Sequence, residues 1–81
     1  MKIEVLFFAQ LKELFGQESQ VVEVKEPITA AELVASLVKE IGCETIESLP
    51  ILFAVNECFE NGDFQLNDCD VLALMTPVAG G

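Results

Sequence analysis

The chain has 81 residues, among them four lysines, no arginine and fourteen acidic residues, which give a net charge of -10 at pH 7. Such a surface repels nucleic-acid phosphates and anionic lipid headgroups, so it argues against nucleic-acid and membrane-surface roles. Hydrophobic residues make up 52% of the chain. They never form the uninterrupted run of about 18 that a membrane span needs, and we expect a cytoplasmic globular domain.

The first predicted element is a strand at residues 2–9, whose side chains alternate between two faces. One face carries Ile3, Val5 and Phe7, and the other carries Glu4, Leu6 and Phe8. Apolar residues at helical spacing then predict a short helix that ends at Gly16. The alternation at residues 20–25 predicts a second strand that returns beside the first.

The strongest helix signal lies at residues 30–41. Thr29 and Glu32 have the spacing of a capping box, and Gly42 follows as the C-cap. Apolar residues form one stripe wide enough to cover a sheet, consisting of Ala30, Leu33, Val34, Leu37, Val38 and Ile41. We therefore expect this helix to pack onto the core.

The second half of the chain predicts short strands joined by tight turns. Residues 51–55 are typical of a strand, which Asn56-Glu57 is expected to turn back toward Cys58-Phe59. Further turn signals lie at residues 61–62 and 67–70. The last predicted strand, at residues 71–76, places Leu72 and Leu74 on one face and Val71, Ala73 and Met75 on the other.

These elements predict an α+β fold in which one main helix crosses one face of a mixed sheet. If the first and last strands are parallel neighbours, Leu6, Phe8 and Met75 share the face away from the helix. An apolar patch there is a candidate docking surface, unless loops cover it. The acidic side chains either only solvate the surface or steer the chain onto basic partner proteins.

No residue pattern supports catalysis by this chain alone. It has no histidine, and its three cysteines are widely spaced, which argues against a Cys/His metal site or a Cys–His nucleophile. The acidic clusters lack the spacing of a calcium loop, so we expect no metal and no permanently bound cofactor. Cys43, Cys58 and Cys69 are expected to be small apolar fillers in a reducing compartment, with Cys69 the exposed one.

The sequence ends in Gly80-Gly81, shortly after Pro77. Glycine has no Cβ atom, so such a tail can pass through a narrow channel and present its carboxylate to another protein's active site. The carboxylate becomes reactive only after activation, most simply as an acyl-adenylate made with ATP. A frayed end without function is the alternative interpretation.

Three segments resemble the small subunits of molybdopterin synthases, sulfur carriers of a MoaD/ThiS-like, ubiquitin-related family. They are residues 6–14, Ala54-Val55-Asn56 and Val78-Ala79-Gly80-Gly81. The resemblance spans the chain and implies a single β-grasp domain over residues 1–81, with 78–81 as a flexible tail. The opening segment is fairly specific, whereas the Gly-Gly ending is shared with the thiazole-pathway sulfur carrier and with ubiquitin.

The resemblance also implies a function for the tail. An ATP-dependent activating enzyme would adenylate Gly81, and a sulfur donor protein would convert it to a thiocarboxylate, with Gly80 giving access. The tail would then enter the large synthase subunit and give its sulfur to the pterin precursor, so that molybdopterin forms for the molybdenum cofactor. The residues that would contact the partner are Leu6, Phe8, Met75, Pro77 and Val78. The chain would thus be a non-catalytic subunit of a heterotetramer.

Two positions depart from the family pattern. Asp68-Cys69-Asp70 stands where many relatives have Asp-Gly-Asp, which predicts a strained or different turn. Leu74 and Met75 stand where aromatic residues are common, and because methionine adapts its shape we expect docking to survive with a different partner preference. A carrier for thiazole synthesis, a ubiquitin-like protein modifier and a plain interaction module remain alternatives.

Overall fold

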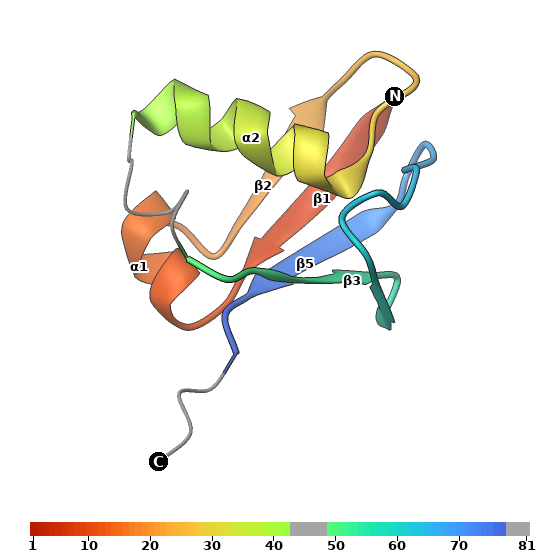
Figure 1. Ribbon diagram of the computed structural model, residues 1–81. Coiled ribbons are helices and arrows are strands. Elements are labelled where there is room, and N and C mark those ends of the chain that lie inside the picture. Colours follow the sequence, from red (N-terminus) through yellow and green to blue (C-terminus); the bar gives the residue numbers. More distant parts are fainter. Residues whose placement is uncertain (43–48, 78–81) are drawn as a thin grey trace.

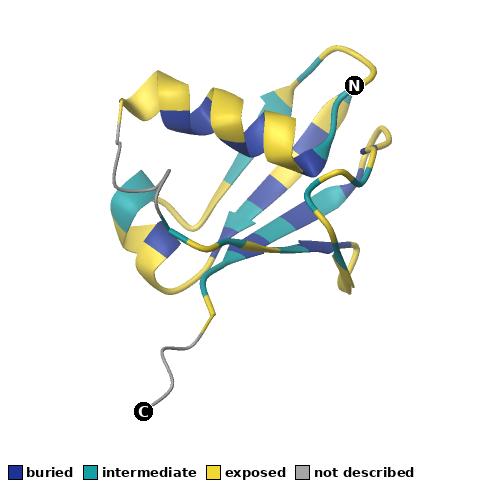
Figure 2. Cartoon of the chain, in the orientation of Figure 1, coloured by how far each residue is buried: buried dark blue, intermediate teal, exposed yellow. Residues whose placement is uncertain are grey.

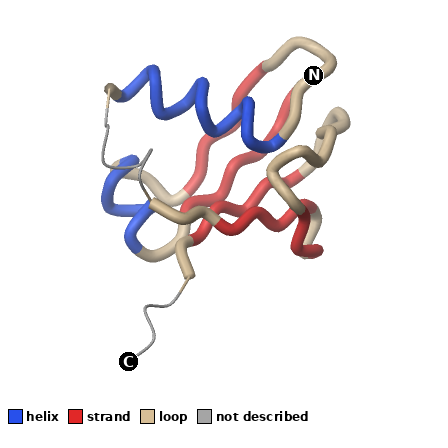
Figure 3. Tube along the Cα trace, in the orientation of Figure 1, coloured by secondary structure: helices blue, strands red, loops and turns tan. Residues whose placement is uncertain are grey.

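A computed structural model describes residues 1–42 and 49–77 of the chain. This part contains two helices, α1 (Gln10–Phe15) and α2 (Ala30–Ile41). Its strands are β1 (Lys2–Phe7), β2 (Ser19–Glu23), β3 (Leu52–Val55), β4 (Cys58–Glu60) and β5 (Val71–Met75). They form one mixed sheet, whose strands are red in Figure 3. The strand order is β2-β1-β5-β3-β4, in which β1 and β5 are parallel and the other pairs antiparallel. The predicted α+β class is confirmed.

Helix α2 covers one face of the sheet (Figure 1). The alternation of β1 and β5 sends Ile3, Val5, Phe7, Leu72 and Leu74 into the core, where each is at most 2% exposed. The side of α2 that faces these strands is buried, and its outer side is exposed (Figure 2). The hydrophobic core therefore lies between α2 and the sheet and leaves the second face of the sheet to solvent.

The predicted capping box at the start of α2 is confirmed. The Glu32 backbone N–H donates to Thr29 Oγ1 at 3.2 Å, and the Thr29 backbone N–H donates to Glu32 Oε1 at 2.9 Å. At the other end Gly42 has a left-handed φ of 66° and donates to the Val38 carbonyl. The apolar stripe predicted for α2 is one residue too long, because Ile41 lies in the last turn of the helix and is 44% exposed.

Helix α1 links β1 to β2 beside the carboxyl end of β1. Leu11 anchors it in the core, and the rings of Phe7 and Phe15 stack with their centroids 4.3 Å apart. It ends at Gly16, whose φ of 73° is left-handed, as the sequence predicts. Within the described ranges, no helix has the length and apolar character needed to cross a bilayer.

The turn before β5 is held onto β1 by three hydrogen bonds. The Lys2 backbone N–H donates to Asp68 Oδ1 at 2.7 Å, the Cys69 N–H donates to the Lys2 carbonyl at 2.8 Å, and the Glu4 N–H donates to the Asp70 carbonyl at 3.1 Å. The hydrogen bond from Lys2 lowers the pKa of the Asp68 carboxyl. Cys69 has a φ of 68°, so of the two predicted alternatives, a strained or a different turn, the backbone shows the strain.

Two of the three cysteines fall within the described residues, and both are exposed. The exposure of Cys69 was predicted. The interpretation of Cys58 as an apolar filler is wrong, because Cys58 lies on the edge strand β4, which has a neighbouring strand on one side only. Cys43 lies outside the described residues.

Candidate functional site

The sheet face opposite α2 contains a mostly apolar hollow of about 570 Å³, which we call the open-face groove. Its walls and floor come from β1, β3, β4 and β5 and from the turn between β3 and β4. The lining residues are Leu6, Phe8, Ala54, Asn56, Glu57, Phe59, Val71, Ala73 and Met75.

Strand register explains why this face is hollow. Leu6 of β1 lies opposite Ala73 of β5, Ala73 lies opposite Ala54 of β3, and Ala54 lies opposite Phe59 of β4. These four side chains therefore form one row across the sheet. The side chains at the two ends of the row are large, and the two in the middle are small. The two alanines make the floor, and Leu6 and Phe59 rise on either side.

At the carboxyl end of β5 the groove is bordered by Phe8 and Met75. The Phe8 backbone N–H donates to the Leu74 carbonyl at 3.1 Å, which holds Phe8 beside β5 just after β1 ends. The Phe8 side chain is 46% exposed. A large apolar side chain this exposed, on a face with an apolar floor, is typical of an interaction surface.

The structure brings three of the predicted contact residues, Leu6, Phe8 and Met75, to this one groove. Pro77 is exposed and follows β5, but it does not line the groove. Val78, Gly80 and Gly81 lie outside the described residues. The docking role of all these residues, and the chemistry of the tail, stay predictions.

Sequence reasoning missed Phe59, which is 70% exposed and forms a whole wall of the groove. The signal was present in the two-residue turn Asn56-Glu57. That turn pairs Val55 with Cys58 and hence Ala54 with Phe59, so both side chains share a face. The two alanines of the floor were also missed as site residues, because a small side chain gives no signal of its own.

Asn56 fastens the β3–β4 turn to the start of β5, in an arrangement we call the Asn56 clamp. Its side-chain Nδ2 donates to Asp70 Oδ1 at 2.9 Å, and its Oδ1 accepts from the Val71 backbone N–H at 3.0 Å. Its backbone N–H donates to the Val71 carbonyl at 2.9 Å. Asp70, which is 9% exposed, also accepts the Asn67 N–H through Oδ2. The clamp thus fixes one end of the groove.

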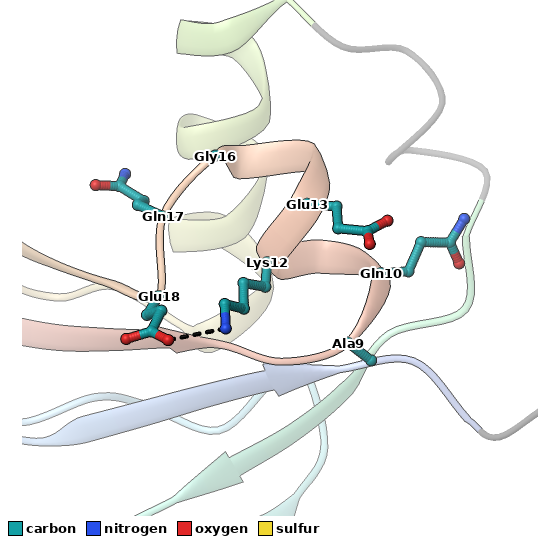
Figure 4. Close-up of a pocket in the computed structure, with 7 residues that line it drawn as sticks. All are labelled: Ala9, Gln10, Lys12, Glu13, Gly16, Gln17 and Glu18. Carbon is teal, nitrogen blue, oxygen red and sulfur yellow. Dashed lines mark ion pairs between the residues drawn. The ribbon is translucent and has the colours of Figure 1, made fainter.

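A second hollow, of about 810 Å³, lies beside α1, and most of the residues that line it are polar or charged (Figure 4). Lys12 Nζ and Glu18 Oε1 form an ion pair across it at 2.8 Å, with both side chains more than half exposed. The hydrogen bond and the charge of Lys12 lower the pKa of the Glu18 carboxyl. Exposed pairs of this kind contribute little binding or folding energy, so the larger hollow is the weaker candidate site.

The groove's chemistry suits binding rather than bond making. Its polar lining groups are Asn56, which is engaged in the clamp, and Glu57. Among the described residues, no three histidine, cysteine, aspartate or glutamate side chains gather in a way that could hold a metal ion. The open-face groove is therefore a candidate site for binding another protein, and this role stays a prediction.

Comparison with known proteins gives consistent results. Residues 5–81 match the model of the ThiS family. The molybdopterin synthase sulfur carrier subunit of Drosophila melanogaster is 34% identical over 83 residues, which cover all of this chain and 92% of that protein. The subunit of the same name from Escherichia coli is 34% identical over 80 residues, 98% of this chain and 99% of that protein.

Solved structures agree with these matches. The crystal structure of small archaeal modifier protein 1 from Haloferax volcanii superposes with a TM-score of 0.84 at 24% identity, covering all of both chains. This likeness confirms the predicted β-grasp fold. A complex of subunits 1 and 2 of molybdopterin-converting factor from Helicobacter pylori contains a chain that is 29% identical, with a TM-score of 0.69 and full coverage of both chains.

Proposed function

Because this chain belongs to the ThiS family, we propose that it is the sulfur carrier subunit of a molybdopterin synthase. The observation that carries the proposal is its 34% identity, over nearly full length, to two subunits that bear this name. The groove adds a physical reason. Strand β5 lies in the middle of the sheet and borders the groove, so a partner docked there would sit beside the strand that leads to the tail.

The chemistry falls to the carboxylate of Gly81. An activating enzyme transfers AMP from ATP to this carboxylate, with release of pyrophosphate, and so creates a leaving group. A hydrosulfide equivalent from a sulfur donor protein then attacks the carbonyl carbon and expels AMP, which leaves a thiocarboxylate. Gly80 keeps the tail narrow enough for an enzyme channel. ATP is consumed by the activating enzyme, and this chain holds no permanent cofactor.

The partner in sulfur transfer is the large synthase subunit. Leu6, Phe8 and Met75 dock through the open-face groove, and Pro77 and Val78 extend the contact toward the tail. The Helicobacter pylori complex of two molybdopterin-converting factor subunits supports such an assembly. Two small and two large subunits form the heterotetramer, the large subunit carries out catalysis, and the product is molybdopterin. We place this assembly in the cytoplasm.

Intact mass spectrometry tests the proposal. The chain is incubated with its activating enzyme, ATP and a sulfur donor, and the expected product carries one sulfur in place of one oxygen at Gly81. A variant that lacks Gly81 serves as the control and should gain no mass. Adding the large subunit and the pterin precursor should then return the carrier to its original mass and yield molybdopterin.

Three results would contradict the proposal. One is a thiocarboxylated chain that gives no molybdopterin with the large subunit, which would favour a carrier for thiazole synthesis. Another is a set of amide-linked conjugates of higher mass, which would indicate a protein modifier. A chain that keeps every activity without Gly80 and Gly81 would be a plain interaction module.

A further inference from the structure

Glu57 is the one charged residue among those that line the open-face groove. It is exposed, and the ion pair found among the described residues joins Lys12 and Glu18 instead. A lone carboxylate at the edge of an apolar hollow attracts a cation and disfavours an acidic partner surface. Glu57 therefore gives the groove a preference for basic partner surfaces, which its apolar residues cannot give.

The position of Glu57 is fixed by its turn. Asn56 and Glu57 form the two-residue connection between β3 and β4 with φ values of 50° and 72°. Such a turn favours asparagine first and glycine second, so a glutamate at the second position strains the backbone. The Asn56 clamp holds the turn to Asp70 and Val71 despite this strain. The turn thus fixes the point on the rim where the Glu57 side chain leaves the backbone.

The floor of the groove sets the second requirement on a partner. Ala54 and Ala73 leave room between Leu6 and Phe59 for a bulky apolar side chain, which would be shielded from water on both sides. Side chains that fill such pockets supply most of the energy of an interface, and charges on the rim supply selectivity and association rate.

We propose that the open-face groove binds a partner segment that places a bulky apolar side chain over Ala54 and Ala73 and a lysine or arginine against Glu57. Glu57 is then the residue that selects a basic partner surface, and the net charge of -10 acts in the same direction. This inference rests on the proposed function, since it takes the large synthase subunit as the partner. It adds the chemistry of the surface that this subunit must present.

The test compares Glu57→Gln with Glu40→Gln, which removes the same charge from the exposed end of α2 on the other face of the molecule. Affinity for the cognate large subunit is measured from low to high salt. Glu57→Gln should weaken binding about two- to fivefold at low salt and flatten its salt dependence. Glu57→Lys should weaken it further, and Glu40→Gln should behave like the wild type.

A second variant separates selectivity from folding. Glu57→Gly suits the left-handed backbone at this position, so it should raise the unfolding temperature or leave it unchanged while it weakens binding as much as Glu57→Gln. If Glu57 served only the fold, affinity and stability would change in the same direction.

Three outcomes would overturn the inference. The first is equal affinity of Glu57→Gln and the wild type at every salt concentration, and the second is an equal loss in Glu40→Gln. In both cases the wild type still binds and transfers sulfur, so the proposed function stands. The third is a thiocarboxylated wild type that neither binds the large subunit nor transfers sulfur to the pterin precursor, and this result removes the proposed function as well.

Discussion

A few residues of this chain have a left-handed backbone conformation, which is unfavourable for most amino acids. Within the described ranges they are Ala9, Asn56, Glu57 and Cys69, besides the glycines Gly16 and Gly42. A residue with a Cβ atom is strained there by roughly 1–2 kcal/mol, unless it is asparagine or aspartate, which tolerate the conformation better. Glu57 and Cys69 both lie in turns that hydrogen bonds tie to neighbouring strands, so the surrounding structure imposes the strain.

Cys69→Gly should stabilise the protein, because glycine adopts a φ near 68° without the Cβ clash. Relative to Cys69→Ala, which keeps the strain and removes the thiol, the free energy of unfolding should rise by about 1 kcal/mol. Urea unfolding followed by circular dichroism measures the difference. A glycine variant less stable than the alanine variant would show that the turn is not strained at this residue.

At the scale of elements, local patterns predicted most of the fold. The range of α2 was correct to the residue, because its capping box and its C-cap glycine are both local signals. The strand predicted at 2–9 ends at Phe7, since Ala9 takes a φ of 51° where the chain enters α1. The strand order and the register between β3 and β5 depend on residues far apart in sequence, and alternation alone does not determine them.

The same difference between local patterns and long-range pairing explains which residues of the candidate site could be predicted from the sequence. Leu6, Phe8 and Met75 were predicted because alternation places them on the face away from the helix. Phe59 was missed because its place depends on the pairing of the three-residue strand β4 with β3. The Asn56 clamp was also missed, since Asn56 and Asp70 are fourteen positions apart and no local pattern links them.

The capping box of α2 should account for a measurable part of its stability. Thr29→Ala removes the hydroxyl that accepts the Glu32 N–H, so the free energy of unfolding should fall by about 1 kcal/mol. Thr29→Ser keeps the acceptor and is the matched control, with a change expected below about 0.5 kcal/mol. Chemical unfolding of both variants checks this, and an equal loss in both would assign the effect to the methyl group instead.

The Asn56 clamp should join two elements, the β3–β4 turn and the start of β5. Asn56→Asp keeps the size of the side chain and the acceptor for the Val71 N–H, but it sets an oxygen against Asp70 Oδ1 in place of the donor. The free energy of unfolding at pH 7 should fall by about 2–3 kcal/mol.

Asn61→Asp is the control for the clamp, since it adds the same charge at an exposed turn position. Its unfolding free energy should stay within about 0.5 kcal/mol of the wild type. Equal stability of Asn56→Asp and Asn61→Asp in urea titrations would mean that the hydrogen bond between Asn56 and Asp70 does not stabilise the fold.

At the scale of the whole molecule, one excess of acidic groups has two opposite effects. A net charge of -10 on 81 residues repels itself in the compact state and so lowers stability. The same charge attracts a basic partner and so speeds association. Salt screens both interactions over distances beyond about 10 Å at 0.1 M. Added salt should therefore stabilise the free chain and at the same time slow its docking.

This opposition gives a prediction with its own control. At pH 7, raising NaCl from about 0.02 to 0.5 M should increase the unfolding temperature, because the Debye length falls from about 20 Å to about 4 Å and carboxylates across the surface stop repelling one another. At about pH 4.5 some carboxylates bind protons, the net charge is smaller, and the same salt step should have a clearly smaller effect. General effects of salt on apolar groups do not depend on pH, so the difference between the two pH values isolates the charge repulsion.

Stopped-flow association with the large subunit under the same conditions should slow as salt rises. If salt destabilised the chain at pH 7, or stabilised it equally at both pH values, repulsion between its carboxylates would not lower its stability. The acidic surface would then serve docking alone.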